Sequence, residues 1–68
     1  MTQEFHDHLK RAMSELPDVF QKTIEMRELQ GLSYDEIANI TGVSLGTVNS
    51  RIARARQRLQ DKLTVYLQ

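Results

Sequence analysis

Apolar residues recur along this chain at intervals of three or four positions, which is the spacing of one face of an α-helix. No segment shows the strict alternation of apolar and polar residues that is typical of a half-buried strand. Proline, glycine and capping residues divide the pattern into separate segments. The expected helices run over about Gln3–Ser14, Asp18–Gln30, Tyr34–Ile40 and Leu45–Leu63 or beyond.

The joints between these segments contain residues that end and start helices. Pro17 suits the first turn of a helix, where its missing N–H is not needed. Gly31 stands as a stop after the second segment. Ser33 and Glu36 have the spacing of a capping box, in which each side chain accepts a hydrogen bond from a backbone N–H at the helix start.

The third and fourth segments form a recognisable unit. Gly42 can take the left-handed conformation that ends a helix, and Ser44 is an N-cap candidate with Thr47 at the matching third position. A short helix, a turn containing glycine and a longer helix make a helix-turn-helix, whose second helix enters the DNA major groove. We therefore expect an all-α fold: one small four-helix domain over residues 1–68, with a helix-turn-helix and a long C-terminal recognition helix.

The helical period assigns faces to each segment. A rotation of about 100° per residue gives the fourth helix a core face of Leu45, Val48, Ile52, Ala55, Leu59 and Leu63. We expect the third helix to bury Ile37, Ala38 and Ile40, and the second to turn inward Phe20, Thr23, Ile24, Met26 and Arg27. We also predict a partly buried ion pair between Arg27 and Glu36.

The opposite face of the fourth helix has the properties of a DNA-reading surface. It carries Gly46, Ser50, Ala53, Arg54 and Gln57, with Thr47, Arg51 and Arg58 on one flank and Asn49 and Arg56 on the other. Small side chains allow a close approach to the bases, while Arg54 can bind guanine and Asn49 adenine through two hydrogen bonds each. Arg51 and Arg58, on the flank, are better placed for phosphates.

Charge is distributed unevenly along the chain, although the formal net charge is zero. Residues 1–44 hold four basic and eight acidic groups, a net of −4, whereas residues 45–68 hold five basic groups and one acidic group, a net of +4. Such asymmetry indicates contact with nucleic acid.

Composition argues against several other classes of protein. The chain has no cysteine, so it forms neither a disulfide nor a thiolate metal site. The polar N-terminus and the lack of an apolar run near about 20 residues predict a cytoplasmic protein with no membrane contact. His6 and His8 point roughly 200° apart on a helix and cannot share a ligand. With no catalytic or phosphate-loop motif present, we expect neither an enzyme nor a cofactor.

Three motifs together resemble a known family. They are Leu16-Pro-Asp18, Met26-Arg-Glu-Leu-Gln-Gly-Leu-Ser-Tyr-Asp-Glu-Ile-Ala38 and Gly46-Thr-Val-Asn-Ser-Arg-Ile-Ala-Arg-Ala-Arg56. This combination resembles region 4 of bacterial sigma factors, most closely the extracytoplasmic-function (ECF) group, over about Leu16 to Leu63.

The resemblance implies binding to double-stranded DNA at the promoter minus-35 element, docking on the β-subunit flap of RNA polymerase, and capture by an anti-sigma factor. It places base contacts at Asn49, Ser50, Ala53 and Arg54, and phosphate contacts at Thr47, Arg51 and Arg58. Ser33 and Ser44, at helix starts, are added as DNA backbone contacts. The family more often has Arg or Lys at position 49 and a bulky residue at position 53. The domain that opens the minus-10 region is absent from these 68 residues, so we expect binding without initiation.

Two other interpretations remain open at this point. A LuxR-type response-regulator output domain shares the pattern Gly31-Leu-Ser-x-x-Glu-Ile-Ala38. A protein-interaction module held by an anti-sigma factor, with little DNA contact, would suit the acidic first half. Binding to a duplex that weakens steeply with salt separates the last interpretation from DNA recognition, because phosphate contacts release counterions.

Overall fold

A computed structural model describes residues 3–67, and these residues form four helices and no strand. The helices are α1 (Gln3–Ser14), α2 (Asp18–Glu28), α3 (Tyr34–Thr41) and α4 (Leu45–Leu67). The predicted all-α fold is confirmed. Helix α2 ends two residues before the predicted Gln30, and α4 continues past Leu63 to Leu67.

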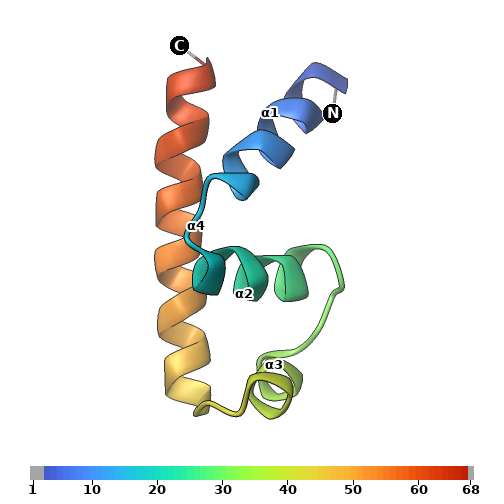
Figure 1. Cartoon of the computed structure of the whole chain (residues 1–68), viewed down its shortest axis with the longest axis vertical. Helices are drawn as coiled ribbons and strands as arrows, with labels where there is room; N and C mark the ends of the chain where they lie inside the picture. Colours follow the sequence, from blue (N-terminus) through green and yellow to red (C-terminus); the bar gives the residue numbers. More distant parts are fainter. Residues whose placement is uncertain (1–2, 68) are drawn as a thin grey trace.

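Helix α4 runs the whole length of the molecule and the other three helices pack along it (Figure 1). Helix α1 lies beside its C-terminal half, α2 crosses its middle and α3 lies at its N-terminal end (Figure 1). Helix α2 makes the most extensive contact with α4. The first turns of α4 therefore project at one end of an elongated molecule of 37 × 18 × 16 Å.

The core consists of two clusters that share α4. One joins Met13, Leu16, Ile24 and Ala55, and the other joins Ile37, Val48 and Ile52. Thr23 is also buried, and its hydroxyl donates to the carbonyl of Val19 at 2.7 Å. Burial of the Val48–Ile52–Ala55 stripe fixes the rotation of α4 about its axis, since these side chains must face the other three helices.

The predicted capping box at Ser33 and Glu36, the left-handed turn at Gly42 and the N-cap at Ser44 are confirmed, whereas α2 ends at Glu28 with Leu29 as its C-cap, ahead of the predicted stop at Gly31. The backbone N–H of Ser33 donates to Glu36 Oε1 at 2.9 Å, and the N–H of Glu36 donates to Ser33 Oγ at 3.1 Å. Gly42 has a φ of +74°, and its N–H donates to the carbonyl of Ala38. At the start of α4, the N–H of Thr47 donates to Ser44 Oγ at 3.1 Å. These contacts set the turn that orients α4 against α3.

Two residues that we expected in the core are exposed. Ile40 is 63% exposed, because the side of α3 that packs inward is centred between Ile37 and Ala38, and Ile40 lies well round from that direction. Leu45 is 50% exposed. It is the first residue of α4, whose N-terminal end lies beside α3 (Figure 1), and it lines an open hollow with Tyr34 and Asn49.

The prediction of an ion pair between Arg27 and Glu36 is wrong, and both side chains have other partners. Arg27 Nη1 instead donates to the carbonyl of Leu32 at 2.9 Å, and Arg27 Cζ lies 5.2 Å from the centre of the Tyr34 ring. Glu36 is committed to the backbone N–H of Ser33. The capping box holds the Glu36 carboxylate at the start of its own helix. Arg27 is hydrogen-bonded to the loop between α2 and α3 instead.

Candidate nucleic-acid interface

The outward face of α4 is exposed along its first half. Among its members, Gly46 and Ser50 are small and Arg54 provides one long donor, and all three residues are solvent-exposed. The buried stripe directly opposite forces this exposure, because residues on the two sides of one helix differ in direction by half a turn. The face thus combines small residues, which do not project far from the helix, with one long arginine side chain.

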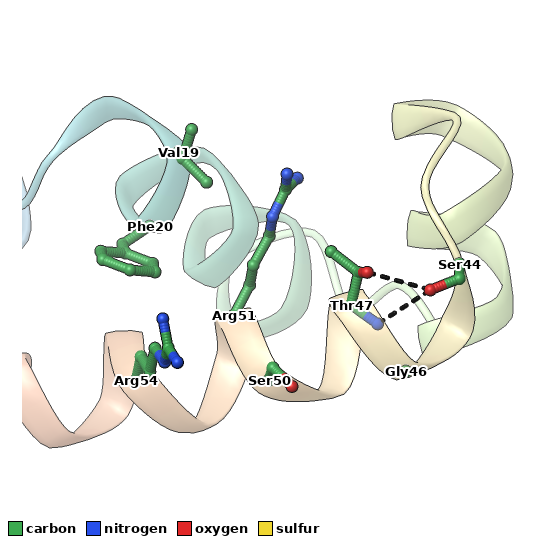
Figure 2. A pocket seen from close by; sticks show the side chains of 8 residues that line it. All are labelled: Val19, Phe20, Ser44, Gly46, Thr47, Ser50, Arg51 and Arg54. Carbon is green, nitrogen blue, oxygen red and sulfur yellow. Dashed lines mark hydrogen bonds between the residues drawn. The ribbon is translucent and has the colours of Figure 1, made fainter.

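An open hollow lies where this face meets α2 (Figure 2). Two apolar residues of α2, Val19 and Phe20, form one wall, and α4 with its N-cap forms the other. The structure brings five of the predicted DNA-contacting residues together around it: Ser44, Thr47, Ser50, Arg51 and Arg54.

The remaining predicted contact residues lie outside that hollow. Asn49 is exposed on the other flank, where it lines a second hollow with Tyr34 and Leu45. Ala53 and Arg58 are exposed farther along α4, and Ser33 lies at the start of α3. The predicted set therefore extends over the outward face and both flanks of α4, with one additional point on α3.

The arginines of α4 differ in whether an acidic side chain neutralises them. Within residues 3–67, no carboxylate lies within ion-pair distance of Arg51, Arg54 or Arg58. Figure 2 shows Arg51 extending away from α4 past Val19, while the Arg54 guanidinium reaches toward the side of Phe20. These guanidiniums keep their positive charge uncompensated at the surface, which suits a polyanionic ligand.

Arg56 and Lys62 are paired with acidic residues of the first half of the chain. Arg56 donates from Nε and Nη2 to Glu28 Oε1, at 3.1 and 2.7 Å. The hydrogen bond to Glu28 raises the pKa of Arg56 above its ordinary value. Lys62 Nζ lies 3.4 Å from Glu15 Oε2. Part of the positive charge that the sequence shows in its second half is therefore used inside the domain.

Sequence reasoning missed the partner of Arg58. Its Cζ lies 5.0 Å from the centre of the Phe20 ring, a residue that the helical pattern assigns only to the core. Phe20 is half-buried and has this second contact on α4. No local spacing signals a contact between residues this far apart, and the same is true of Glu28 with Arg56.

The described residues contain no group of three His, Cys, Asp or Glu side chains that could hold a metal ion. None of the helices that the structure describes is both long and apolar enough to cross a membrane.

The short α3, the left-handed turn at Gly42 and the long α4 with an exposed, arginine-flanked face define a helix-turn-helix domain. Residues 6–59 match the family model described as sigma-70, region 4. The chain is 44% identical over 66 residues to the ECF RNA polymerase sigma factor SigE of Mycolicibacterium smegmatis, covering 90% of this chain and 26% of that protein. It is 41% identical over 63 residues to the ECF RNA polymerase sigma-E factors of Escherichia coli K12 and Salmonella typhimurium LT2, covering 93% of this chain and 33% of each relative.

The chain belongs to the sigma-70 region 4 family and is of the ECF type. This family is one of transcription regulators, and its match distinguishes the chain from response-regulator output domains. The chain spans about a quarter to a third of the length of these curated relatives.

Proposed function

We propose that this domain binds promoter DNA at the minus-35 element, with α4 lying in the major groove. The observation that supports this most directly is the exposed face of α4, where small side chains stand beside Arg51, Arg54 and Arg58, three arginines that no described carboxylate neutralises. Small side chains allow the backbone of such a helix to approach the base edges closely, and the arginines carry positive charge that attracts the phosphates.

The proposal gives two groups of residues different tasks. Base edges are contacted by Asn49, Ser50, Ala53 and Arg54, which lie on the outward face or beside it. Phosphates on either side of the groove are contacted by Thr47, Arg51, Arg58, Ser33 and Ser44. Ser33 and Ser44 each accept a backbone hydrogen bond in their capping role. The hydroxyls of Ser44 and Thr47 lie 2.9 Å apart and share one hydrogen bond, so one O–H of that pair remains available for a phosphate.

Selection of the 68-residue chain on a library of random duplexes tests the proposal. We expect one short preferred sequence, and an affinity for it that falls linearly in logarithm with the logarithm of salt concentration. A scrambled duplex of the same length and composition is the control for sequence preference. Binding that is absent, or that does not change with salt, would overturn the proposal in favour of a module that contacts only proteins.

We further propose that the domain docks on the RNA polymerase core at the β-subunit flap, and that an anti-sigma factor competes for the same domain. Support comes from a mostly apolar hollow between α1, α2 and α4, lined by Leu9, Met13, Ile24, Glu28, Leu29, Arg56 and Leu59. Leu29 at its edge is 66% exposed. None of the residues that line this hollow is assigned to DNA contact, so the domain can bind DNA and the polymerase core at the same time.

Binding of the chain to purified polymerase core separates the two surfaces. Leu29→Ser should weaken this binding and leave duplex affinity unchanged. Val65→Ser is the matched control, because Val65 is 71% exposed and lies outside the hollow. Equal losses in both variants would show that the hollow is not the docking surface.

A further inference from the structure

Phe20 contacts two different parts of the molecule. It lies in the first turn of α2, where its half-buried ring packs against the core cluster that includes Ala55. The Arg58 guanidinium lies over the same ring, with Cζ 5.0 Å from the ring centre. Because core packing holds the ring in place, the ring offers Arg58 a fixed surface rather than a mobile one.

This contact differs in kind from the one that holds Arg56. An ion pair occupies N–H groups, and Arg56 gives both Nε and Nη2 to Glu28. An aromatic face attracts the cation through the ring quadrupole and uses none of the five N–H donors around the guanidinium edge. The Arg58 side chain forms no hydrogen bond or ion pair with any residue in the part of the chain that the structure describes.

The same ring faces the hollow into which other arginines project. Phe20 lines it together with Arg51 and Arg54, and Figure 2 shows the Phe20 side chain from α2 and the Arg54 side chain from α4 approaching it from opposite sides. Arg58 lies outside the hollow, and it is the arginine whose guanidinium lies over the ring.

We propose that Phe20 is a positioning residue, which orders Arg58 for a DNA phosphate while leaving its donors available. This inference rests on the proposed DNA-binding function and assigns a second role to a core residue. A side chain that is already ordered loses less rotamer freedom when it binds, so the ring increases affinity without touching the DNA. It favours no base, so its effect is the same on every duplex.

Duplex binding by three variants tests the inference. Phe20→Leu keeps an apolar side chain against the core but removes the ring, and should weaken binding to all duplexes roughly 2- to 5-fold. Phe20→Tyr keeps the ring and should restore wild-type affinity. Introduced into Arg58→Gln, the Phe20→Leu change should have no further effect. Thermal unfolding of each variant confirms that it is folded before binding is compared.

Relaxation of the Arg58 Nε–H group, measured by NMR in the protein without DNA, provides a second readout. We expect its order parameter to fall in Phe20→Leu and to stay at the wild-type value in Phe20→Tyr. Equal losses of affinity from Phe20→Leu with and without Arg58, or no loss at all, would overturn the positioning role. In those cases the wild-type domain still binds duplex and the proposed function stands. Absence of duplex binding by the wild-type domain overturns both.

Discussion

The two flanks of α4 carry the same type of residue in different states. On one flank Arg56 is tied to Glu28 of α2 by two hydrogen bonds to a single carboxylate oxygen. On the other flank Arg51 and Arg58 have no carboxylate partner among the described residues, and Arg58 lies on the Phe20 ring instead. Arg56 and Arg58 are both exposed, so exposure alone does not distinguish these two arginines.

The difference shows that a count of arginines overstates the charge that is available to a ligand. Arg56 connects α4 to α2 and partly cancels the acidic charge of the first half of the chain. Arg51 and Arg58 add to the field of the surface that α4 presents. Assigning a DNA-binding role to an arginine of this helix therefore requires knowing its partner. Substitutions on and around the two flanks test how far the contrast holds.

The largest effect on stability is expected at Gly42, in the turn that orients α4 and therefore both of its flanks. Gly42→Val should lower the free energy of unfolding by about 1–3 kcal/mol, because a β-branched residue is strained in a left-handed conformation. Gly42 has a φ of +74°, and an added Cβ would meet no atom within 4 Å, so the cost is in the backbone and not in packing. Denaturant unfolding measures it, with Gly42→Asn as the milder control. Equal stability of the valine and wild-type proteins would contradict the turn.

Arg54 projects from the outward face between the flanks, and should affect base preference rather than overall affinity. Arg54→Ala should relax discrimination at one base pair by about 1–3 kcal/mol. The measurement is affinity for a set of single-base variants of the selected duplex. If Arg54→Ala weakens every duplex alike, the guanidinium contacts phosphate, and α4 sits in the groove differently from the proposal.

The two flanks themselves are compared directly by Arg58→Gln and Arg56→Gln. Loss of Arg58 should weaken all duplexes and lower the slope of affinity against salt by about one. Loss of Arg56 should leave that slope unchanged and reduce stability by about 0–1 kcal/mol, the usual value of an exposed ion pair.

Glu28→Gln is the matched control for that comparison. It breaks the same pair from the α2 side and should cost the same small amount of stability as Arg56→Gln, measured by denaturant unfolding. A reduced salt slope in Arg56→Gln, equal to that of Arg58→Gln, would show that the ion pair opens on DNA and that the flanks do not differ.

The smallest effect concerns stability in the acid range. The hydrogen bond from the Ser33 backbone lowers the pKa of Glu36 below its ordinary value, and the hydrogen bond with the Ser33 side chain lowers it further. Its contribution to stability is present above the unfolded pKa of about 4.3 and is lost as pH falls through the lower folded value. Glu36→Gln keeps a capping side chain that does not titrate, so its stability should fall less over this range. Identical pH profiles of the two proteins would rule out this role.

The sequence determined the four helices and several of their ends. Apolar spacing specified four helices, and local chemistry at Ser33, Gly42 and Ser44 specified where α3 begins and ends and where α4 begins, because capping acts over three or four residues. The stripe of Val48, Ile52 and Ala55 then fixed which side of α4 remains exposed. Periodicity failed at Ile40 and Leu45, since it gives a direction around a helix and does not show whether another helix covers that side.

Only the tertiary structure decided which charges pair. Arg27 lies against Tyr34 rather than Glu36, Arg56 pairs with Glu28, and Arg58 lies over the ring of Phe20. Each of the last two contacts joins residues of α2 and α4 that are distant in sequence. Their meeting depends on the crossing of the two helices, which is set by the packing of the whole core and not by any local motif.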